Sequence, residues 1–253
     1  GATPPPPPPP PPPPQMPSVW TSALRLGARP LNVIIFGSTG GTGLAAIRLA
    51  LDKGWRVTAF TRTATKLDSS LRATDRCSPA LTIVEGDALD AASVAAAISG
   101  HDAVIVLIGA SSVIGSQTVC ADSTQNIISA MNEASVRRLV VVSAMGAGNS
   151  RPFLTRFAKW MMKHPLADKT AQEALVRESG LDFVLVRPSA LNDEDAKGSG
   201  AVAVVDSSKK PVPFEEISRS DLAAFLLDQC SGEAFLGMAP GLSWKPPATS
   251  RGT

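Results

Sequence analysis

Three glycines at three-residue spacing are the residues of this chain best suited to binding phosphate. Gly37, Gly40 and Gly43 lie in the segment G-S-T-G-G-T-G, directly after an apolar run. In such a segment the first glycine permits a tight turn, the second lets a pyrophosphate approach the backbone, and the third allows a helix to pack closely. Free N–H groups at the start of that helix favour an anion. The spacing predicts a dinucleotide site, with a plain strand-turn-helix as the alternative.

Two basic residues indicate which dinucleotide would bind. An acidic residue at the end of the second strand holds the ribose hydroxyls of NAD, whereas a 2′-phosphate requires a cation there. This chain has Arg62 at that place and Lys66 one helical turn later. An arginine fork can clamp a phosphate while a lysine adds a point charge. We therefore predict NADP(H) as the cofactor, the alternative being that both residues are solvated surface cations.

Polar or small residues follow three further apolar runs. Asp87 and Ala88 come after residues 81–84, Gly109 ends residues 103–109, and Ser143 ends residues 138–143. Because the carboxyl ends of parallel strands meet at one edge of a sheet, we expect these residues near a common ligand. Asp87 could accept a hydrogen bond from an adenine amino group or could serve as a helix cap or turn residue. Ser143 could bind a nicotinamide, a substrate carbonyl or a water, or could cap the strand.

The elements that must position these residues alternate along the chain. Apolar runs at 33–36, 56–62, 81–84, 103–109, 138–143 and 183–186 read as strands, and segments such as 90–99, 116–134 and 169–179 read as helices. This alternation predicts an α/β fold, a doubly wound parallel sheet (Rossmann fold) in a single domain. We expect that domain over residues 31–240, with a small C-terminal substrate region.

Both ends of the chain are expected to lie outside the domain. Residues 1–30 are predicted to be a disordered proline-rich segment, and residues 241–253 a flexible tail. The unbroken proline run 4–14 favours a stiff polyproline II spacer, with a ligand for an aromatic-groove adaptor domain as the alternative.

Composition excludes several classes of function. With 253 residues, 44% of them hydrophobic, and a net charge of +2, the chain suits one α/β domain and gives no charge signal for nucleic acid. Its three cysteines lie far apart, which fits neither a metal site nor a disulfide framework. We therefore predict that the protein binds no metal and works in a reducing, cytoplasmic location. The longest charge-free apolar stretches, such as residues 103–110, are too short for stable membrane insertion.

Several of these motifs together resemble a known family. The G-S-T-G-G-T-G loop, F-T-R, E-G-D-A, V-I-V-L-I-G, V-V-V-S-A, the segment A-L-V-R-E-S-G-L-D-F-V-L-V-R-P and the late I-S-R-S-D-L-A-A-F-L-L are similar to the atypical short-chain dehydrogenase/reductases. Within that family the chain most resembles the NmrA-like group that includes biliverdin-IXβ reductase, also called flavin reductase. The similarity covers residues 31–230.

The resemblance implies an NADP(H)-binding reductase that is a monomer or weak dimer. It assigns Gly37, Thr39, Gly40, Gly41 and Thr42 to the phosphates, Arg62 and Lys66 to the 2′-phosphate, Asp87 and Ala88 to adenine, and Ile108, Gly109 and Ser143 to the nicotinamide end. Gly43 and Pro188 complete the predicted cofactor site.

Departures from the family pattern bear on catalysis. The chain contains no tyrosine, so the Tyr-x-x-x-Lys acid of ordinary short-chain dehydrogenases is absent. Lys169 and Ala190 stand where the biliverdin reductase-like pattern has histidines. Lys169 could pair with Glu173 at i,i+4 spacing, or could face the pocket and hold an acidic substrate. We predict Ser143 and Lys169 as the catalytic residues.

Residues 151–164 combine apolar and basic side chains and are predicted to form a lid over the substrate. Core packing and a membrane-surface or dimer contact are the alternatives. The expected function is NADPH-dependent hydride transfer to a small molecule, a planar conjugated, quinone-like or flavin-type substrate, with the proton from water or relayed by Ser143. A non-catalytic NADP-sensing or scaffold protein is the alternative.

Overall fold

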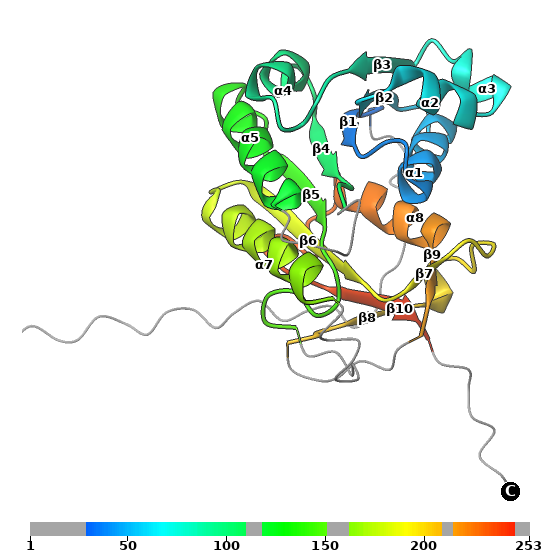
Figure 1. Ribbon diagram of the computed structural model, residues 1–253. Coiled ribbons are helices and arrows are strands. Elements are labelled where there is room, and N and C mark those ends of the chain that lie inside the picture. Colours follow the sequence, from blue (N-terminus) through cyan, green and yellow to red (C-terminus); the bar gives the residue numbers. More distant parts are fainter. Residues whose placement is uncertain (1–28, 110–117, 151–161, 209–214, 246–253) are drawn as a thin grey trace, which may run out of the picture.

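A computed structural model of the chain describes residues 29–109, 118–150, 162–208 and 215–245. Eight strands form one sheet in the order β3-β2-β1-β4-β5-β6-β10-β8 (Figure 1). Neighbouring strands are parallel except for β8, which runs antiparallel to β10. In chain order the strands are β1 (Asn32–Phe36), β2 (Arg56–Thr61), β3 (Leu81–Glu85), β4 (Ala103–Val106), β5 (Arg138–Val142), β6 (Asp182–Pro188), β8 (Val202–Val205) and β10 (Gly241–Trp244).

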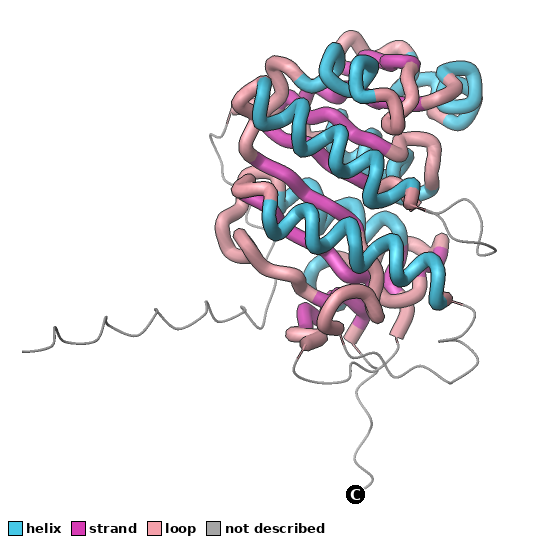
Figure 2. Tube along the Cα trace, turned by 60° about the vertical axis from the view of Figure 1, so that its left-hand side comes forward, coloured by secondary structure: helices cyan, strands magenta, loops and turns pink. Residues whose placement is uncertain are grey.

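Helices cover both faces of this sheet. One face carries α1 (Gly41–Asp52) and α8 (Arg219–Gln229), and the other carries α4 (Ala91–Ile98), α5 (Val119–Glu133) and α7 (Lys163–Glu178). Figure 2 shows α5 and α7 as the two long helices lying side by side across their face. Two short helices, α2 (Ala64–Ser70) and α3 (Ala73–Arg76), connect β2 to β3. The predicted α/β fold with a doubly wound, mostly parallel sheet is therefore confirmed.

The apolar run before the glycine loop forms the centre of the sheet. Along β1, Val33 and Ile35 pack into the core beneath α1 and α8, whereas Ile34 and Phe36 pack into the core beneath α4 and α5. All four side chains are fully buried. A strand covered on both faces has no solvent side, and for this reason its sequence shows a continuous apolar run rather than an alternation.

A second, two-stranded sheet lies after β6. It pairs β7 (Leu191–Asn192) in parallel with β9 (Ile217–Ser218), and a 3₁₀ turn at Ser199–Ala201 lies between them in sequence. β9 leads directly into α8. The segment expected to form a C-terminal substrate region thus leads into α8, which packs against α1.

The predicted flexible tail is wrong for its first residues. Gly241–Trp244 form β10, which lies between β6 and β8 and is buried throughout. Leu242 fills the core, and the Trp244 indole nitrogen donates a hydrogen bond to Asp221 at 2.8 Å. Four residues flanked by Pro240 and Lys245 are too few for a periodic pattern, so the strand depends on tertiary contacts. Residues 1–28 and 246–253 lie outside the described residues.

Two other boundaries differ from the sequence-based expectation. β6 continues through Arg187 and Pro188, because Leu242 of β10 pairs with Pro188. α7 begins at Lys163, so the last two residues of the predicted lid belong to a helix, and residues 151–161 lie outside the described part. No described helix is both long and apolar enough to cross a membrane.

Candidate functional site

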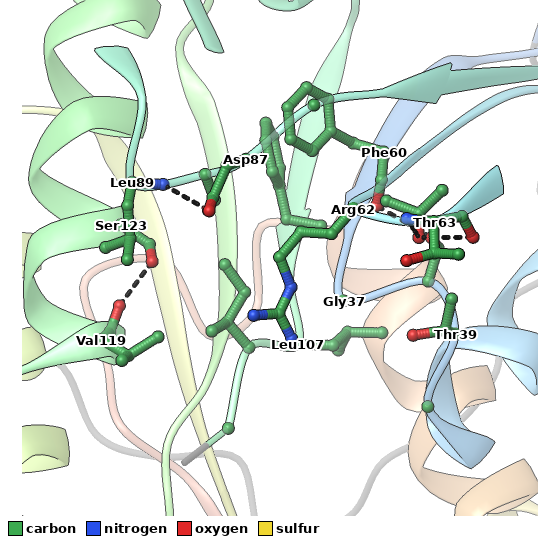
Figure 3. Close-up of a pocket in the computed structure, with 18 of the residues that line it drawn as sticks. Gly37, Thr39, Phe60, Arg62, Thr63, Asp87, Leu89, Leu107, Val119 and Ser123 are labelled. Carbon is green, nitrogen blue, oxygen red and sulfur yellow. Dashed lines mark hydrogen bonds between the residues drawn. The ribbon is translucent and has the colours of Figure 1, made fainter. Parts of the chain in front are cut away.

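A pocket of about 520 Å³ opens at the carboxyl ends of β1 to β4 (Figure 3). Pockets at this edge of an open α/β sheet are the usual ligand sites of the fold. Its lining comes from the ends of those four strands, the loops that follow them, and the first turns of α5. The lining residues are Phe36, Gly37, Ser38, Thr39, Gly40, Phe60, Thr61, Arg62, Thr63, Lys66, Gly86, Asp87, Ala88, Leu89, Leu107, Ile108, Gly109, Val119 and Ser123.

The first and third glycines of the loop have the predicted tasks. Gly37 has φ +83°, and a Cβ there would lie 2.8 Å from the carbonyl carbon of Leu107. A Cβ on Gly43 would lie 2.5 Å from the Gly37 carbonyl oxygen. The turn off β1 and the close packing of α1 onto it therefore both require glycine.

The second glycine has no comparably close neighbour among the residues that the structure describes. A Cβ on Gly40 would approach nothing closer than 3.6 Å. The helix that begins at Gly41 has neither a side-chain cap nor an acidic residue in its first turn. Free backbone donors beside open space fit the pyrophosphate of a dinucleotide. Thr39 lines this part of the pocket, whereas Gly41 and Thr42 adjoin it as the first residues of α1.

Two cations stand at the end of β2, as predicted. Arg62 and Lys66 are both exposed and line the pocket. Figure 3 shows the Arg62 side chain extending into the pocket between Asp87 and Thr39. Over the described ranges no acidic side chain pairs with either cation, and Glu85, the nearby carboxylate, accepts from the Ala64 amide at 2.9 Å. Both cations are available to a phosphate.

Asp87 and Ala88, which follow β3, also line this pocket. Asp87 Oδ1 accepts a hydrogen bond from the Leu89 amide at 3.0 Å, which makes Asp87 a turn residue. The helix cap that was its alternative role belongs to Asp90, whose carboxylate accepts from two amides at the start of α4. Asp87 Oδ2 has no partner among the described residues, so it can accept a hydrogen bond from a ligand.

Ile108 and Gly109 line the pocket beside Gly37, but Ser143 is not among the described lining residues. The Ser143 side chain is 3% exposed, and its hydroxyl donates to Glu173 Oε1 at 2.7 Å. Its only hydroxyl proton thus already has a buried acceptor, and a contact between Ser143 and the cofactor stays a prediction. Pro188 likewise lies inside β6, where its carbonyl accepts from the Met145 amide.

Lys169 is buried and fully hydrogen-bonded. Its ammonium donates to the carbonyl oxygens of Ile108 at 2.8 Å and Val142 at 2.7 Å, and to Gln172 Oε1 at 3.0 Å. Burial lowers the pKa of Lys169. All three ammonium hydrogens are thus donated within the protein, and none of them goes to Glu173. Lys169 instead joins the ends of β4 and β5 and fixes the backbone of Ile108.

A buried ion pair that is not part of the described pocket lining was not predicted from the sequence. Arg187 donates to both oxygens of Glu173, at 2.6 and 2.8 Å, and both side chains are at most 1% exposed. Burial alone would raise the pKa of Glu173, but hydrogen bonds from Arg187, Ser143 and Arg177 lower it below its ordinary value. The spacing of Glu173 suggested Lys169 as its partner, whereas the fold supplies Arg187 from β6.

A second buried carboxylate fixes the start of α5. Asp168 accepts hydrogen bonds from the amides of Cys120 at 3.0 Å and Ala121 at 2.9 Å. Asp168 thus caps a helix from a different helix, which no local motif indicates. Burial raises the pKa of the Cys120 thiol to about 11, so this cysteine is not a thiolate nucleophile at neutral pH. In the described part of the chain no cluster of His, Cys, Asp and Glu could hold a metal ion.

The fold and the pocket define a nucleotide-binding protein of the Rossmann class. The family model described as NAD(P)H-binding matches residues 37–232, and the chain belongs to this family. The expected class, an oxidoreductase of the NAD(P)-binding superfamily, is confirmed at this level, because the relatives include proteins named as reductases and dehydrogenases.

The similar proteins include one curated reductase and two solved structures. Reductase pytE of Aspergillus terreus is 27% identical over 78% of this chain and 90% of its own length. ChuY of Escherichia coli O157:H7, described as an anaerobilin reductase, has a TM-score of 0.70 at 26% identity, covering 85% of this chain and 99% of that chain. A short-chain dehydrogenase/reductase of Veillonella parvula solved with NADP shares the fold, with a TM-score of 0.69, 17% identity and coverage of 87% and 96%. The match to the chloroplastic protein TIC 62 of Arabidopsis thaliana, at 29% identity, spans only 27% of that longer protein.

Proposed function

We propose that this protein is an NADPH-dependent reductase that transfers hydride to a planar conjugated, quinone-like or flavin-type substrate. One observation carries the proposal. A single pocket brings together the glycine loop, the unpaired cations Arg62 and Lys66, the adenine-side pair Asp87 and Ala88, and the strand end Ile108 and Gly109. These residues supply the kinds of groups that bind the pyrophosphate, the 2′-phosphate, the adenine and the nicotinamide end of NADP(H).

The preference for NADP(H) over NAD(H) rests on charge. The strand-end position that holds ribose hydroxyls in NAD-binding proteins is occupied by Arg62 rather than by an acidic residue. Lys66 lies one turn along α2 on the same pocket wall. Together they supply a planar fork and a point charge for a 2′-phosphate.

The protein's own contribution to the reaction is orientation. When bound, the nicotinamide supplies the hydride. The glycine loop and the start of α1 hold the phosphates, and Ile108 and Gly109 form the wall at the reacting end. Lys169 keeps that wall in place through the Ile108 carbonyl, and so acts as a positioning residue rather than a catalytic one.

The substrate class is supported by the side chains of the described lining, whose one carboxylate, Asp87, is assigned to the adenine side. The chain has no tyrosine, and the described lining holds no histidine, cysteine or glutamate. A substrate that receives a hydride without a concerted proton must delocalise the negative charge that forms. Conjugated acceptors do so, and water can then deliver the proton. The relative named as an anaerobilin reductase supports this class.

A specific observation also favours a second candidate, a non-catalytic NADP-sensing protein. Both residues predicted to be catalytic, Ser143 and Lys169, have their polar hydrogens donated within the protein. A sensor needs the cofactor pocket but no group that acts on a substrate.

Turnover distinguishes the two functions. We expect steady NADPH oxidation when the protein is supplied with a panel of a quinone, a bilin and a free flavin, and none in protein-free controls. NADPH carrying deuterium at the transferred position should slow the reaction if hydride transfer limits the rate. Tight NADPH binding with no oxidation across the panel would favour the sensor.

Replacing Ser143 with alanine should reduce the rate of NADPH oxidation by less than about tenfold. The hydroxyl hydrogen-bonds to Glu173 outside the pocket lining, so its loss removes a buried bond to a charged group, about 1.5–3 kcal/mol of folding stability, rather than a proton relay. Single-turnover oxidation at a saturating acceptor concentration measures the rate. A loss beyond about 10²-fold with unchanged NADPH affinity would indicate that the hydroxyl takes part in proton transfer.

A further inference from the structure

Arg219, the first residue of α8, lies against the start of α1. A Cβ placed on Gly41 would lie 2.6 Å from Arg219 Cδ and 3.1 Å from its Nε. Gly41 has no positive φ, and the absence of a side chain there leaves room for the arginine in this position. The side chain from a late segment of the chain is thus seated on the residue that follows Gly40 in the phosphate-binding loop.

The fold brings this side chain to the loop by packing two helices together. α1 and α8 lie side by side on one face of the sheet (Figure 1). The start of α8 is fixed by Ser218, whose hydroxyl oxygen accepts from the Asp221 amide at 3.0 Å. Asp221 is itself buried and accepts bonds from two further backbone amides, at Lys197 and Gly198. These hydrogen bonds hold the start of α8, and with it the Arg219 backbone, in place beside α1.

An exposed carboxylate holds the guanidinium in this structure. Arg219 Nη1 lies 2.7 Å from Asp193 Oδ1, which is itself 3.7 Å from the Cβ position on Gly41. The Asp193 side chain is 83% exposed and that of Arg219 is 30% exposed. Such an exposed pair contributes little and is easily exchanged for another anion. A carboxylate beside the uncapped start of α1 therefore marks a place where negative charge is favourable.

We propose that Arg219 is a further cofactor ligand that exchanges Asp193 for an oxygen of the dinucleotide pyrophosphate. The inference rests on the proposed function, because it requires a dinucleotide on the glycine loop. An arginine fork binds phosphate oxygens in a planar geometry, and the free amides of α1 contribute donors to the same anion. Cofactor binding would then release Asp193, which follows β7 in the C-terminal segment.

The proposal separates Arg219 from Arg62 by the part of the cofactor that each contacts. The pyrophosphate is common to NADPH and NADH, whereas the 2′-phosphate belongs to NADPH alone. Calorimetric titration should therefore show that Arg219→Ala weakens both cofactors by a similar factor, about tenfold. Adenosine 2′-monophosphate lacks the pyrophosphate, and its affinity should be unchanged.

Asp193→Asn should change cofactor affinity in the opposite direction, and because Asp193 is exposed the substitution should not disturb folding. It removes the competing carboxylate and should tighten both cofactors about two- to fivefold. The double variant with Arg219→Ala should bind as weakly as Arg219→Ala alone. Arg137→Ala, at the opposite edge of the sheet, is the matched control and should leave all affinities unchanged.

Each contrary outcome is distinguishable. Wild-type protein that binds NADPH, with Arg219→Ala and Asp193→Asn both without effect, overturns the role of Arg219 and leaves the proposed function standing. A loss confined to NADPH would assign Arg219 to the 2′-phosphate and would also overturn it. Wild-type protein that binds neither cofactor overturns the proposed function itself. If Arg219→Ala does not fold, Arg219→Gln and Asp193→Asn still give the test.

Discussion

Replacing Arg62 with alanine should weaken NADPH binding at least about tenfold and leave NADH binding nearly unchanged. The guanidinium extends into the pocket and has no acidic partner in the described part of the chain, so its free energy of interaction is available to a ligand phosphate. Calorimetric titration of both cofactors against both proteins measures the effect. The quantity that matters is the ratio of the two affinities, which cancels any general change in the pocket.

Two further variants sharpen this test. Arg62→Asp places a carboxylate where NAD-binding proteins hold the ribose hydroxyls, and should shift the preference toward NADH. Arg137→Ala removes an exposed arginine far from the pocket and should change neither affinity. Equal losses for NADPH and NADH in Arg62→Ala would show that Arg62 supports the pocket without contacting a 2′-phosphate.

Replacing Arg187 with methionine should lower the free energy of unfolding by about 3–5 kcal/mol, because it leaves the buried Glu173 carboxylate without its main partner. Urea unfolding monitored by circular dichroism measures the loss. The double variant Glu173→Gln with Arg187→Met removes the unpaired charge and should recover much of the stability. A double variant no more stable than Arg187→Met alone would contradict the assignment of the loss to the buried charge.

The same ion pair predicts a direction of pH dependence. The pKa of Glu173 is lowered in the folded protein, so the pair contributes its full stability above the ordinary pKa of 4.5. That contribution is lost as the pH falls through the lowered value. The stability advantage of the wild type over Arg187→Met should therefore be largest near neutral pH and should shrink below about pH 4.5. An advantage that is constant down to pH 3 would contradict the role of this carboxylate.

The parts of the fold that were predictable are those set by local rules. Val33 to Phe36 form a strand buried on both faces, and such a strand shows in the sequence as an apolar run. Gly37 and Gly43 have tasks that follow from their spacing along one turn and one helix start. Arg62 and Asp87 both line the pocket, because each lies within two residues of a strand end and parallel strands share one carboxyl edge.

The parts that were missed depend on contacts between distant elements. A pair between Glu173 and Lys169 along one helix was one of two alternatives for this lysine, but the fold places Arg187 of β6 beside Glu173 and turns Lys169 toward two backbone carbonyls. Whether a buried lysine meets a carboxylate or a carbonyl is decided by tertiary packing, on which i,i+4 spacing carries no information. Trp244 joins the sheet through β10 for the same reason.

Ser143 illustrates a different limit. It does follow a strand at the carboxyl edge, as predicted, yet its hydroxyl is directed to Glu173 rather than into the pocket. Side chains of successive residues at a strand end point to opposite faces, so the edge can be predicted more easily than the face. Most of the predicted lid, residues 151–161, lies outside the described part, so the lid stays a prediction.

Titration of the wild-type protein with NADPH and with NADH tests the central claim most directly. The glycine loop and the uncapped start of α1 predict that both dinucleotides bind, at one site per chain. Arg62 and Lys66, which have no acidic partner among the described residues, predict that NADPH binds at least about tenfold more tightly than NADH. Equal affinities would contradict the assignment of these cations to a 2′-phosphate, and the absence of binding by either cofactor would contradict the account as a whole.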